Sequence, residues 1–447
     1  MPGDPFSGLF VPDALAETTS AEAWLRAMLD AEAALAGAEA EAGLIPREAA
    51  EAIEKACAAG GFDPDAIAAA GRASANPVVP LVAALQEKVG GEAAGFVHYG
   101  ATSQDVLDTA AMLVASRTLT GIRAELDGVA AACAELAKEH RGTPMVGRTL
   151  LQQALPITFG LKAAGWLDAV IGTRERLHSL SLAVQLGGAA GTLASLGEGG
   201  ERVVVLLAER LGLDEPAVPW HTARARIADL GASLGLTAGT VEKIAQDLVL
   251  LSQTEVGEVA ERSGGGRGGS STLPHKRNPV GSVLTIACAR RVRADAGVLL
   301  AAMPQEHERA AGAWQSEWAP LNEALALTGG AASALRWALD GLEVRPDRMR
   351  ENLDATGGLI MAESVVAALG ERLGRARARE VVDAACERGL DSGTPLRDQL
   401  VGDEAVSGEL SEEEIDRALD PIGYLGSAGA FVDRALERYQ GYREERS

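Results

Sequence analysis

The sequence predicts an all-α fold, organised as three helical domains of which the central one is a bundle of long helices. Alanine, leucine and glutamate are all abundant, and aromatic residues make up only 4% of the composition, a balance that favours helix over sheet. The second observation is the pattern, because long runs with helical periodicity are separated by few breaks. The third is the length, since 447 residues are too many for one hydrophobic core.

The N-terminal domain is predicted to contain shorter helices. Ser20 is a good N-cap for the run that follows it, and Gly43 ends that run. A second helix follows Pro46 and stops at Gly60 and Gly61. Later breaks divide the chain into an N-terminal helical domain, a central long-helix bundle domain and a C-terminal helical domain, over residues 1–111, 112–354 and 355–447.

The central domain shows the strongest helical periodicity. In the run IAQDLVLLSQTEVGEV, we expect Ile244, Leu248, Leu251 and Val259 to lie on one face of a single helix. Glu255 projects onto the same face, and a buried carboxylate needs a partner or a function. Glu255 could form an ion pair inside the bundle or have a functional role, and the sequence does not decide between them. Helices this long also predict a bundle core.

The charge balance excludes some classes of partner. The formal net charge is −22, which argues against a nucleic-acid groove or a membrane-binding face, because both need basic surface. A local cluster of arginine and lysine can still bind an anionic substrate. We expect neither nucleic acid nor a membrane as a partner, and the family resemblance given below implies a small anionic di- or tricarboxylate substrate.

The cysteines indicate a reducing compartment. Cys57, Cys133, Cys288 and Cys386 are far apart and form no CxxC pair, so buried free thiols are expected rather than disulfides or a metal site. The first residues lack the pattern of a signal peptide, and no apolar run is long enough for a membrane span. The prediction is a cytoplasmic protein without a metal, nucleotide or other cofactor.

Three polar segments interrupt the helices and are the candidates for chemistry. The first polar segment is VHYGATSQD at 97–105, the second is GRTLLQQALP at 147–156, and the third is GRGGSSTLPHKRNP at 266–279. Each also has a plain structural interpretation: a helix cap, a turn before a helix, and a flexible surface loop. The third is the most specific, because its glycines let backbone amides converge on an anion next to hydroxyl, ammonium and amide side chains.

Together the three segments resemble the fumarase/aspartase superfamily, whose signature GSSxMPxKxNP is matched here by GSSTLPHKRNP with Leu273 in the methionine place. The resemblance covers nearly the whole chain, with the segments in the right order. Within the superfamily, these stretches together with PWHTARAR and MPQEHER are most similar to the bacterial 3-carboxy-cis,cis-muconate cycloisomerase family. The resemblance implies a three-domain helical subunit and a homotetramer, in which each active site gathers the three segments from three subunits.

Two departures from the superfamily pattern point to the chemistry. Many members carry a histidine in the second segment, paired with a glutamate seven residues after the loop lysine. Here these places hold Leu150 and, counted from Lys276, Val283. An amine or hydroxide leaving group needs a general acid, whereas a carboxylate departs without a proton. Loss of both groups therefore indicates a reaction with a weakly basic leaving group, such as lactone closure and opening.

The predicted catalytic residues belong to the third polar segment. Ser270 is the expected proton carrier, with Ser271 or His98 as the alternative. Lys276 and Asn278 are expected to bind the carboxylate that becomes enediolate-like. The remaining predicted substrate-binding residues are His98, Thr102, Ser103, Arg148, Thr149, Gln152, Arg267, Ser271, His307 and Arg309. The arginines could equally form structural ion pairs. Among the other histidines, His221 is a plausible pocket residue, whereas His140 and His178 are interpreted as helix-surface residues.

The expected function is conversion of 3-carboxy-cis,cis-muconate to 4-carboxymuconolactone. A sister lyase that expels a weak base such as nitrite from nitrosuccinate fits the leaving-group reasoning equally well. Adenylosuccinate lyase is a weaker alternative, because the acid–base pair is missing. A non-catalytic structural protein on the same scaffold is the alternative from another class.

Overall fold

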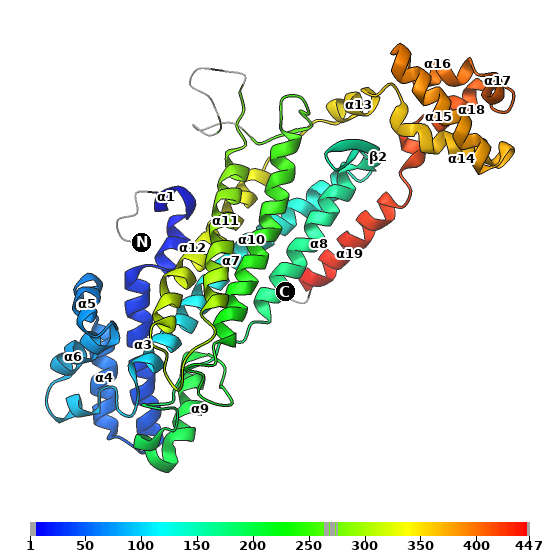
Figure 1. Ribbon diagram of the computed structural model, residues 1–447. Helices are drawn as coiled ribbons and strands as arrows, with labels where there is room; N and C mark the ends of the chain where they lie inside the picture. The colour runs from blue at the N-terminus through cyan, green and yellow to red at the C-terminus, as the bar shows by residue number, and fades with distance from the viewer. Residues whose placement is uncertain (1–5, 263–267, 269–272, 274–275, 445–447) are drawn as a thin grey trace. The chain divides into compact units, whose positions relative to one another are not determined.

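The computed structural model describes residues 6–262, 268, 273 and 276–444. Over these residues the chain is mostly helical, and its only strands form two small antiparallel pairs, β1 with β2 and β3 with β4 (Figure 1). The all-α prediction is confirmed. The α-helices are α1 Ser7–Phe10, α2 Asp13–Thr18, α3 Ala21–Glu41, α4 Arg47–Ala59, α5 Pro64–Ala70, α6 Val78–Val89, α7 Ser103–Glu139, α8 Phe159–His178, α9 Gly200–Leu211, α10 Ala225–Leu251, α11 Val280–Ala301, α12 Ala313–Leu339, α13 Pro346–Asp354, α14 Ala362–Leu373, α15 Arg375–Ser392, α16 Leu396–Val401, α17 Glu404–Ser407, α18 Glu412–Ala418 and α19 Ala428–Glu444.

The shorter elements connect these helices. The strands are β1 Pro144–Thr149, β2 Gln152–Thr158, β3 Val259–Ala260 and β4 Glu343–Val344, and the 3-10 helices are η1 Gly71–Ala73, η2 Glu92–Phe96, η3 Ala194–Gly199, η4 Leu359–Met361 and η5 Pro421–Tyr424. The chain divides into two compact units. Unit 1 comprises residues 1–127, 173–243 and 284–335, and unit 2 comprises 128–172, 244–283 and 336–447. The three-domain division with boundaries near 111 and 354 stays a prediction.

In unit 1, α3 begins and ends where the local sequence predicts. The Ser20 side chain accepts a hydrogen bond from the Ala23 amide at 3.1 Å, which satisfies one of the free N–H groups at the helix start. α4 likewise ends at Gly60, whose φ of 58° lies in the left-handed region that favours glycine. α3 packs against α4 and α9, and Ala38 and Leu206 are part of the buried cluster that joins α3 to α9.

The long helices of unit 1 pack closely against one another. α10 and α11 approach where Gly231 lies against Leu299, since a Cβ added at the glycine would be 2.6 Å from the leucine side chain. α11 and α12 are joined by an Arg291–Glu323 ion pair of 2.9 Å. These contacts agree with the predicted long-helix bundle (Figure 1).

The C-terminal helices of unit 2 have a hydrophobic core of their own. Residues of α14, α15, α16 and α18 form it, and its fully buried members include Leu369, Val382, Leu396, Leu400 and Ile415. Burial of such side chains contributes roughly 1.5–3 kcal/mol each, so this cluster holds the four helices together.

The prediction of one helix through residues 244–259 is wrong. α10 ends at Leu251, and the chain turns before it enters β3 at Val259. The chain turns again at Gly257, whose amide donates to the Gln253 carbonyl at 2.7 Å and whose φ is 65°, so the helix does not continue to Val259. Glu255 is consequently exposed. The buried carboxylate of this region is Glu258.

Two further side-chain expectations can be compared with the structure. His140 was expected on a helix surface but is buried, with its ring edge-on to Phe159 and its Nδ1 3.1 Å from the Thr143 hydroxyl. Burial lowers the pKa of His140, against the opposing charge of Glu139.

The four cysteines are free and, except for the half-buried Cys386, fully buried. Within the described ranges no single helix is long and apolar enough to cross a membrane, and residues 346–354 and 359–373 reach that length only as a pair bent by 82°.

Candidate active site

The first polar segment leads directly into α7. The Thr102 amide donates to Asp105 Oδ2 at 2.9 Å, so the acid three residues ahead caps the helix start. Thr102 and Ser103 are half-buried, and neither hydroxyl has a hydrogen-bond partner within the described part of the chain. The segment can therefore be a helix cap and a polar site at once. Asp105 caps the helix, and the Thr102 and Ser103 hydroxyls are left to bind a ligand.

Asp105 also fixes a second loop against this segment. Its carboxylate accepts from the amides of Gly187 at 3.0 Å and Gly188 at 2.9 Å, and lies 2.6 Å from Nε2 of the buried His221. His221 is thus a buried partner of Asp105. We did not predict Asp105 as a site residue, although its place in the TSQD motif was the available signal.

His98 has the most unusual environment of the predicted residues. Its φ is 61°, an uncommon conformation for a residue other than glycine, and its Nδ1 lies 2.7 Å from Glu32 Oε1 on α3. Burial lowers the pKa of His98, but the charge and hydrogen bond of Glu32 and the charge of Asp105 outweigh burial and raise it. Glu32 was missed by the sequence reasoning, although it is a carboxylate on the apolar face of a helix.

Arg309 reaches the same region of unit 1. Its guanidinium donates to Gln104 Oε1 at 3.3 Å and to the Ala189 carbonyl at 2.9 Å. No carboxylate pairs with it among the residues that the structure describes. Because neutral acceptors hold the Arg309 guanidinium, its full charge is available to an anion. His307, two residues before Arg309, is exposed, and its carbonyl accepts from the Thr222 hydroxyl at 2.9 Å.

A buried ion-pair network supports this arrangement. Arg224 donates to Asp108 at 2.7 and 2.9 Å and to Glu317 at 2.6 Å. Gln305, four residues before Arg309, donates to Glu317 at 2.8 Å. The network thereby connects α7, α10 and α12 to the stretch that carries Arg309.

In unit 2 the second polar segment forms a β-hairpin, which the sequence reasoning did not anticipate. Thr149 of β1 pairs with Gln152 of β2, so only Leu150 and Leu151 connect the strands. Both leucines have positive φ, 51° and 65°, as in a type I′ turn, whose usual residues are asparagine and glycine. Their side chains are 96% and 77% exposed. Strain and exposed apolar surface coincide at the tip, which is typical of a functional element.

Arg148 next to the tip forms an ion pair. Its two terminal nitrogens donate to Glu258 at 2.9 and 2.7 Å, and the glutamate is fully buried. One of the interpretations left open for this arginine, a structural ion pair, therefore applies. Thr149 and Gln152 are exposed on either side of the turn.

The third polar segment is described only in part. Ser270, Ser271 and Arg267 lie outside the described residues. Lys276 is exposed and has no ion-pair partner among the described residues, and the Asn278 amide donates to the Gly268 carbonyl at 2.9 Å.

The neighbouring residues anchor both sides of the third segment within unit 2. Arg277 donates to Glu343 at 2.6 Å and to the Glu261 carbonyl at 2.9 Å. The Glu261 carboxylate accepts from the amides of Gly281 and Ser282, each at 2.9 Å, and so satisfies the free N–H groups at the start of α11. These contacts fix the chain between Lys276 and Asn278, at Arg277, and shortly after Asn278, at Gly281 and Ser282.

Val283, in the place of the superfamily glutamate, is on the first turn of α11 and is 53% exposed. Leu150 and Val283 are therefore both accessible apolar positions. Neither can transfer a proton, so any proton transfer must use other groups.

The predicted site residues are divided between the two units. Unit 1 contains His98, Thr102, Ser103 and Arg309, and unit 2 contains Arg148, Thr149, Gln152, Lys276 and Asn278.

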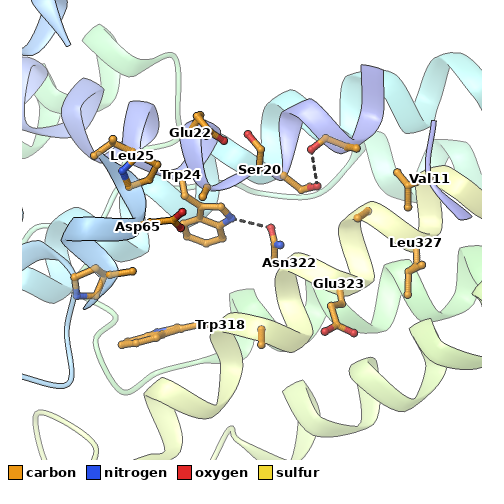
Figure 2. Close-up of a pocket in the computed structure, with 18 of the residues that line it drawn as sticks. Val11, Ser20, Glu22, Trp24, Leu25, Asp65, Trp318, Asn322, Glu323 and Leu327 are labelled. Atoms are coloured by element: carbon orange, nitrogen blue, oxygen red, sulfur yellow. Dashed lines mark hydrogen bonds between the residues drawn. The ribbon is translucent and has the colours of Figure 1, made fainter. Parts of the chain in front are cut away.

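A cavity of about 730 Å³ lies elsewhere in unit 1, beside Trp24 and Trp318 (Figure 2). The Trp24 indole donates to Asn322 at 2.7 Å. Carboxylates line the cavity, and the Arg291 guanidinium is already paired with Glu323. Its size is that of a ligand site, but its charge would repel a tricarboxylate. The polar segments, not this cavity, are therefore the candidate active site.

Comparisons with known proteins give consistent results. The chain matches the family model described as Lyase over residues 11–294 and that of the adenylosuccinate lyase C-terminus over residues 358–435. It is 46% identical to a 3-carboxy-cis,cis-muconate cycloisomerase of Pseudomonas aeruginosa, over 97% of this chain and 96% of that protein. It is 48% identical to a nitrosuccinate lyase of Streptomyces davaonensis, over 93% and 90%. The crystal structure of a 3-carboxy-cis,cis-muconate lactonizing enzyme from Pseudomonas putida superposes with a TM-score of 0.93 at 44% identity, covering 99% and 100%.

Proposed function

The chain belongs to the lyase family of the fumarase/aspartase superfamily, and on that premise we propose that it closes 3-carboxy-cis,cis-muconate into 4-carboxymuconolactone. The observation that carries the proposal is the pair of exposed aliphatic residues Leu150 and Val283, at the places where the superfamily pattern has a histidine and a glutamate. A site that retains cationic groups but lacks this acid–base pair suits a leaving group that needs no proton.

The reaction has such a leaving group. In the forward direction one substrate carboxylate adds to a conjugated carbon–carbon double bond, and the adjacent carbon, enediolate-like, takes up one proton. In the reverse direction a base removes that proton and the lactone oxygen leaves as a carboxylate. The conjugate acid of a carboxylate has a pKa of about 4, so it departs unprotonated near neutral pH. One protein proton carrier is therefore sufficient.

We propose Ser270 as that carrier. A serine hydroxyl is a weak base unless its alkoxide is stabilised, and the glycine-rich sequence around it offers backbone amides for this purpose. Lys276 and Asn278 would bind the carboxylate whose charge spreads into the enediolate-like state. Their benefit lies in interactions that strengthen as that charge grows.

The remaining carboxylates need further donors. Arg309, His98, Thr102 and Ser103 are the proposed donors from unit 1, and the absence of a carboxylate partner for Arg309 among the described residues supports its assignment. Arg148 has N–H donors beyond those that Glu258 accepts. The other proposed binding residues are Thr149, Gln152, Arg267, Ser271 and His307.

We also propose a homotetramer with shared active sites. Exposed apolar side chains on the long helices support it, because such residues are typical of surfaces covered by another subunit. On α10 and α11 they are Leu236, Leu250, Val283, Val298 and Leu300. Sedimentation that gives a stable, active monomer would contradict this assembly. The four free cysteines support a reducing, cytoplasmic location.

The experiment that tests the function is an absorbance assay with 3-carboxy-cis,cis-muconate. Lactone closure destroys the conjugated diene, so ultraviolet absorbance should fall at a rate proportional to enzyme concentration. Ser270→Ala protein at the same concentration is the matched control for contaminating activity. A well-folded protein that leaves the absorbance unchanged would refute the proposal.

The second candidate is elimination of nitrite from nitrosuccinate, because a nitrosuccinate lyase is 48% identical to this chain. Nitrite is also a weakly basic leaving group, so the same residues would suffice. Nitrite release measured beside diene loss distinguishes the two activities. A non-catalytic protein would show neither activity and no rise in thermal stability with tricarboxylates, whereas ligand binding raises it.

A further inference from the structure

A buried carboxylate on α3 contacts the imidazole of the first polar segment. Glu32 lies on the apolar face of α3 with Met28 and Leu25, one and two turns earlier, and its side chain is 1% exposed. Its Oε1 is 2.7 Å from His98 Nδ1, whereas its Oε2 has no hydrogen-bond partner within the described part of the chain. A carboxylate buried with one contact depends strongly on that contact.

The contact to Glu32 determines which ring nitrogen of His98 is left for a ligand. The His98 φ of 61° is an uncommon conformation for a residue with a Cβ. Because Nδ1 faces Glu32, a contact to an ionised carboxylate places a proton on Nδ1. Nε2 is then the nitrogen left for a ligand, and the side chain retains 16% exposure.

The charged groups around His98 favour its protonated form. They are Glu32 of α3 and Asp105 of α7. Two further titratable groups interact with Glu32, namely Glu39 of α3 and the Cys57 thiol of α4. Burial, followed by the charge of Glu32, raises the pKa of Glu39 to about 9, and burial raises that of the Cys57 thiol to about 12. Glu39 and Cys57 are therefore neutral at pH 7. Glu32 is the carboxylate that touches His98, and Asp105 is shared with His221.

We propose that Glu32 is a positioning residue that holds His98 as an imidazolium and presents its Nε2–H to a substrate carboxylate. The inference rests on the proposed function for the identity of that carboxylate. Hydrogen bonds between two ionised groups are shorter and stronger than those between neutral groups, so the pair would matter chiefly for binding. Substrate affinity should then fall on the alkaline side, as His98 loses its proton.

The test compares Glu32→Gln with wild-type enzyme from pH 6 to 9. Glu22→Gln, an exposed glutamate on the same helix, is the matched control. We expect Glu32→Gln to raise KM for 3-carboxy-cis,cis-muconate roughly tenfold or more, as loss of a charged hydrogen bond does, with a smaller change in kcat. The alkaline limb of kcat/KM should also move to lower pH. Glu32→Asp, which keeps the charge, should restore part of the shift.

A second measurement does not depend on turnover. Calorimetric titration with tricarballylate, an unreactive tricarboxylate, should show affinity that declines with pH above the ordinary histidine pKa, and His98→Gln should remove that decline. Should Glu32→Gln fail to fold, the comparison of His98→Gln with wild type still tests the inference, because a decline that persists in His98→Gln would overturn it.

The two possible failures are distinguishable. An active enzyme whose alkaline limb is the same in Glu32→Gln and Glu22→Gln, or persists in His98→Gln, overturns the role of Glu32 alone. Folded wild-type enzyme that neither consumes the diene nor binds tricarballylate overturns the proposed function together with this inference.

Discussion

Arg148 donates both terminal guanidinium nitrogens to Glu258, at 2.9 and 2.7 Å. The glutamate is fully buried and the arginine side chain is 24% exposed. Asn352 adds a third donor to the same carboxylate at 2.8 Å. The hairpin of the second polar segment is thereby fixed to the residues that lead into the third segment.

Removal of the arginine should destabilise unit 2. Arg148→Ala would leave the buried Glu258 carboxylate with Asn352 as its only side-chain partner among the described residues, and we expect a loss of about 3–5 kcal/mol in the apparent free energy of unfolding. Chemical denaturation measures it. Arg377→Ala is the control, because its pair with Glu380 on α15 is largely exposed and should contribute less than about 1 kcal/mol. Equal effects of the two variants would contradict the buried-pair interpretation.

Replacing the two leucines at the hairpin tip should change stability and activity in opposite directions. Replacing Leu150-Leu151 by Asn-Gly supplies residues that favour positive φ at both positions, so thermal stability should rise by about 1 kcal/mol. Activity should nevertheless fall at least about tenfold if the apolar tip contributes to the site, since one tenfold step is only 1.4 kcal/mol. Unfolding temperature and kcat/KM check the two effects.

The matched control for this turn variant is Leu390→Asn. Leu390 is 68% exposed near the end of α15, so its loss removes apolar surface without altering the hairpin. It should leave kcat/KM unchanged. A turn variant with wild-type kcat/KM would show that the tip takes no part in catalysis.

The helix boundaries that could be predicted from the sequence are those determined by local chemistry. The Ser20 cap and the Gly60 stop involve residues within one turn of the helix end. The hairpin escaped prediction because Leu150 and Leu151 carry no turn signal, and the strands exist through pairing with each other. The end of α10 was misplaced because the apolar spacing continued by coincidence to Val259 of β3.

The candidate site was predictable in its motif residues and not in their partners. His98 and Arg148 were found because their motifs could be matched as contiguous letters. Their carboxylate partners are 66 and 110 residues away in the chain, so only the fold brings them together. A glutamate on an apolar helix face was the available signal for Glu32, and it does not say which residue will meet it.

Ser270→Ala tests the proton carrier directly. The loss of one oxygen from a polar loop should leave the unfolding temperature unchanged, while kcat should fall by a factor of about 10²–10⁴, the usual contribution of a positioned acid–base group. Ser271→Ala is the comparison: because Ser271 is proposed to bind substrate and not to carry the proton, its loss should raise KM more than it lowers kcat. The reverse ranking of the two serines would move the proton-transfer role to Ser271, and a near-normal rate in both would move it to His98.

Glu39 should give the stability of unit 1 a measurable pH dependence. Burial, then the charge of Glu32, raises the pKa of Glu39 from 4.5 to about 9, so the folded state retains a proton that the unfolded state releases over that interval. Its contribution to stability is therefore fully present below pH 4.5 and is lost as the pH rises toward 9. Glu39→Gln resembles the protonated acid and has no proton to lose.

The variant should therefore gain stability over wild type at pH 8, because the folded wild-type protein must hold a proton that its unfolded state has released. The gain should be at least about 1.4 kcal/mol, the worth of one pKa unit, and much less at pH 5. Unfolding temperatures at the two pH values measure the difference, with the half-exposed Glu41→Gln on the same helix as control. Equal gains at both pH values would mean that Glu39 is not protonated in the folded state at pH 8. Its burial without a hydrogen-bond partner among the described residues would then require a neutralising cation near this carboxylate.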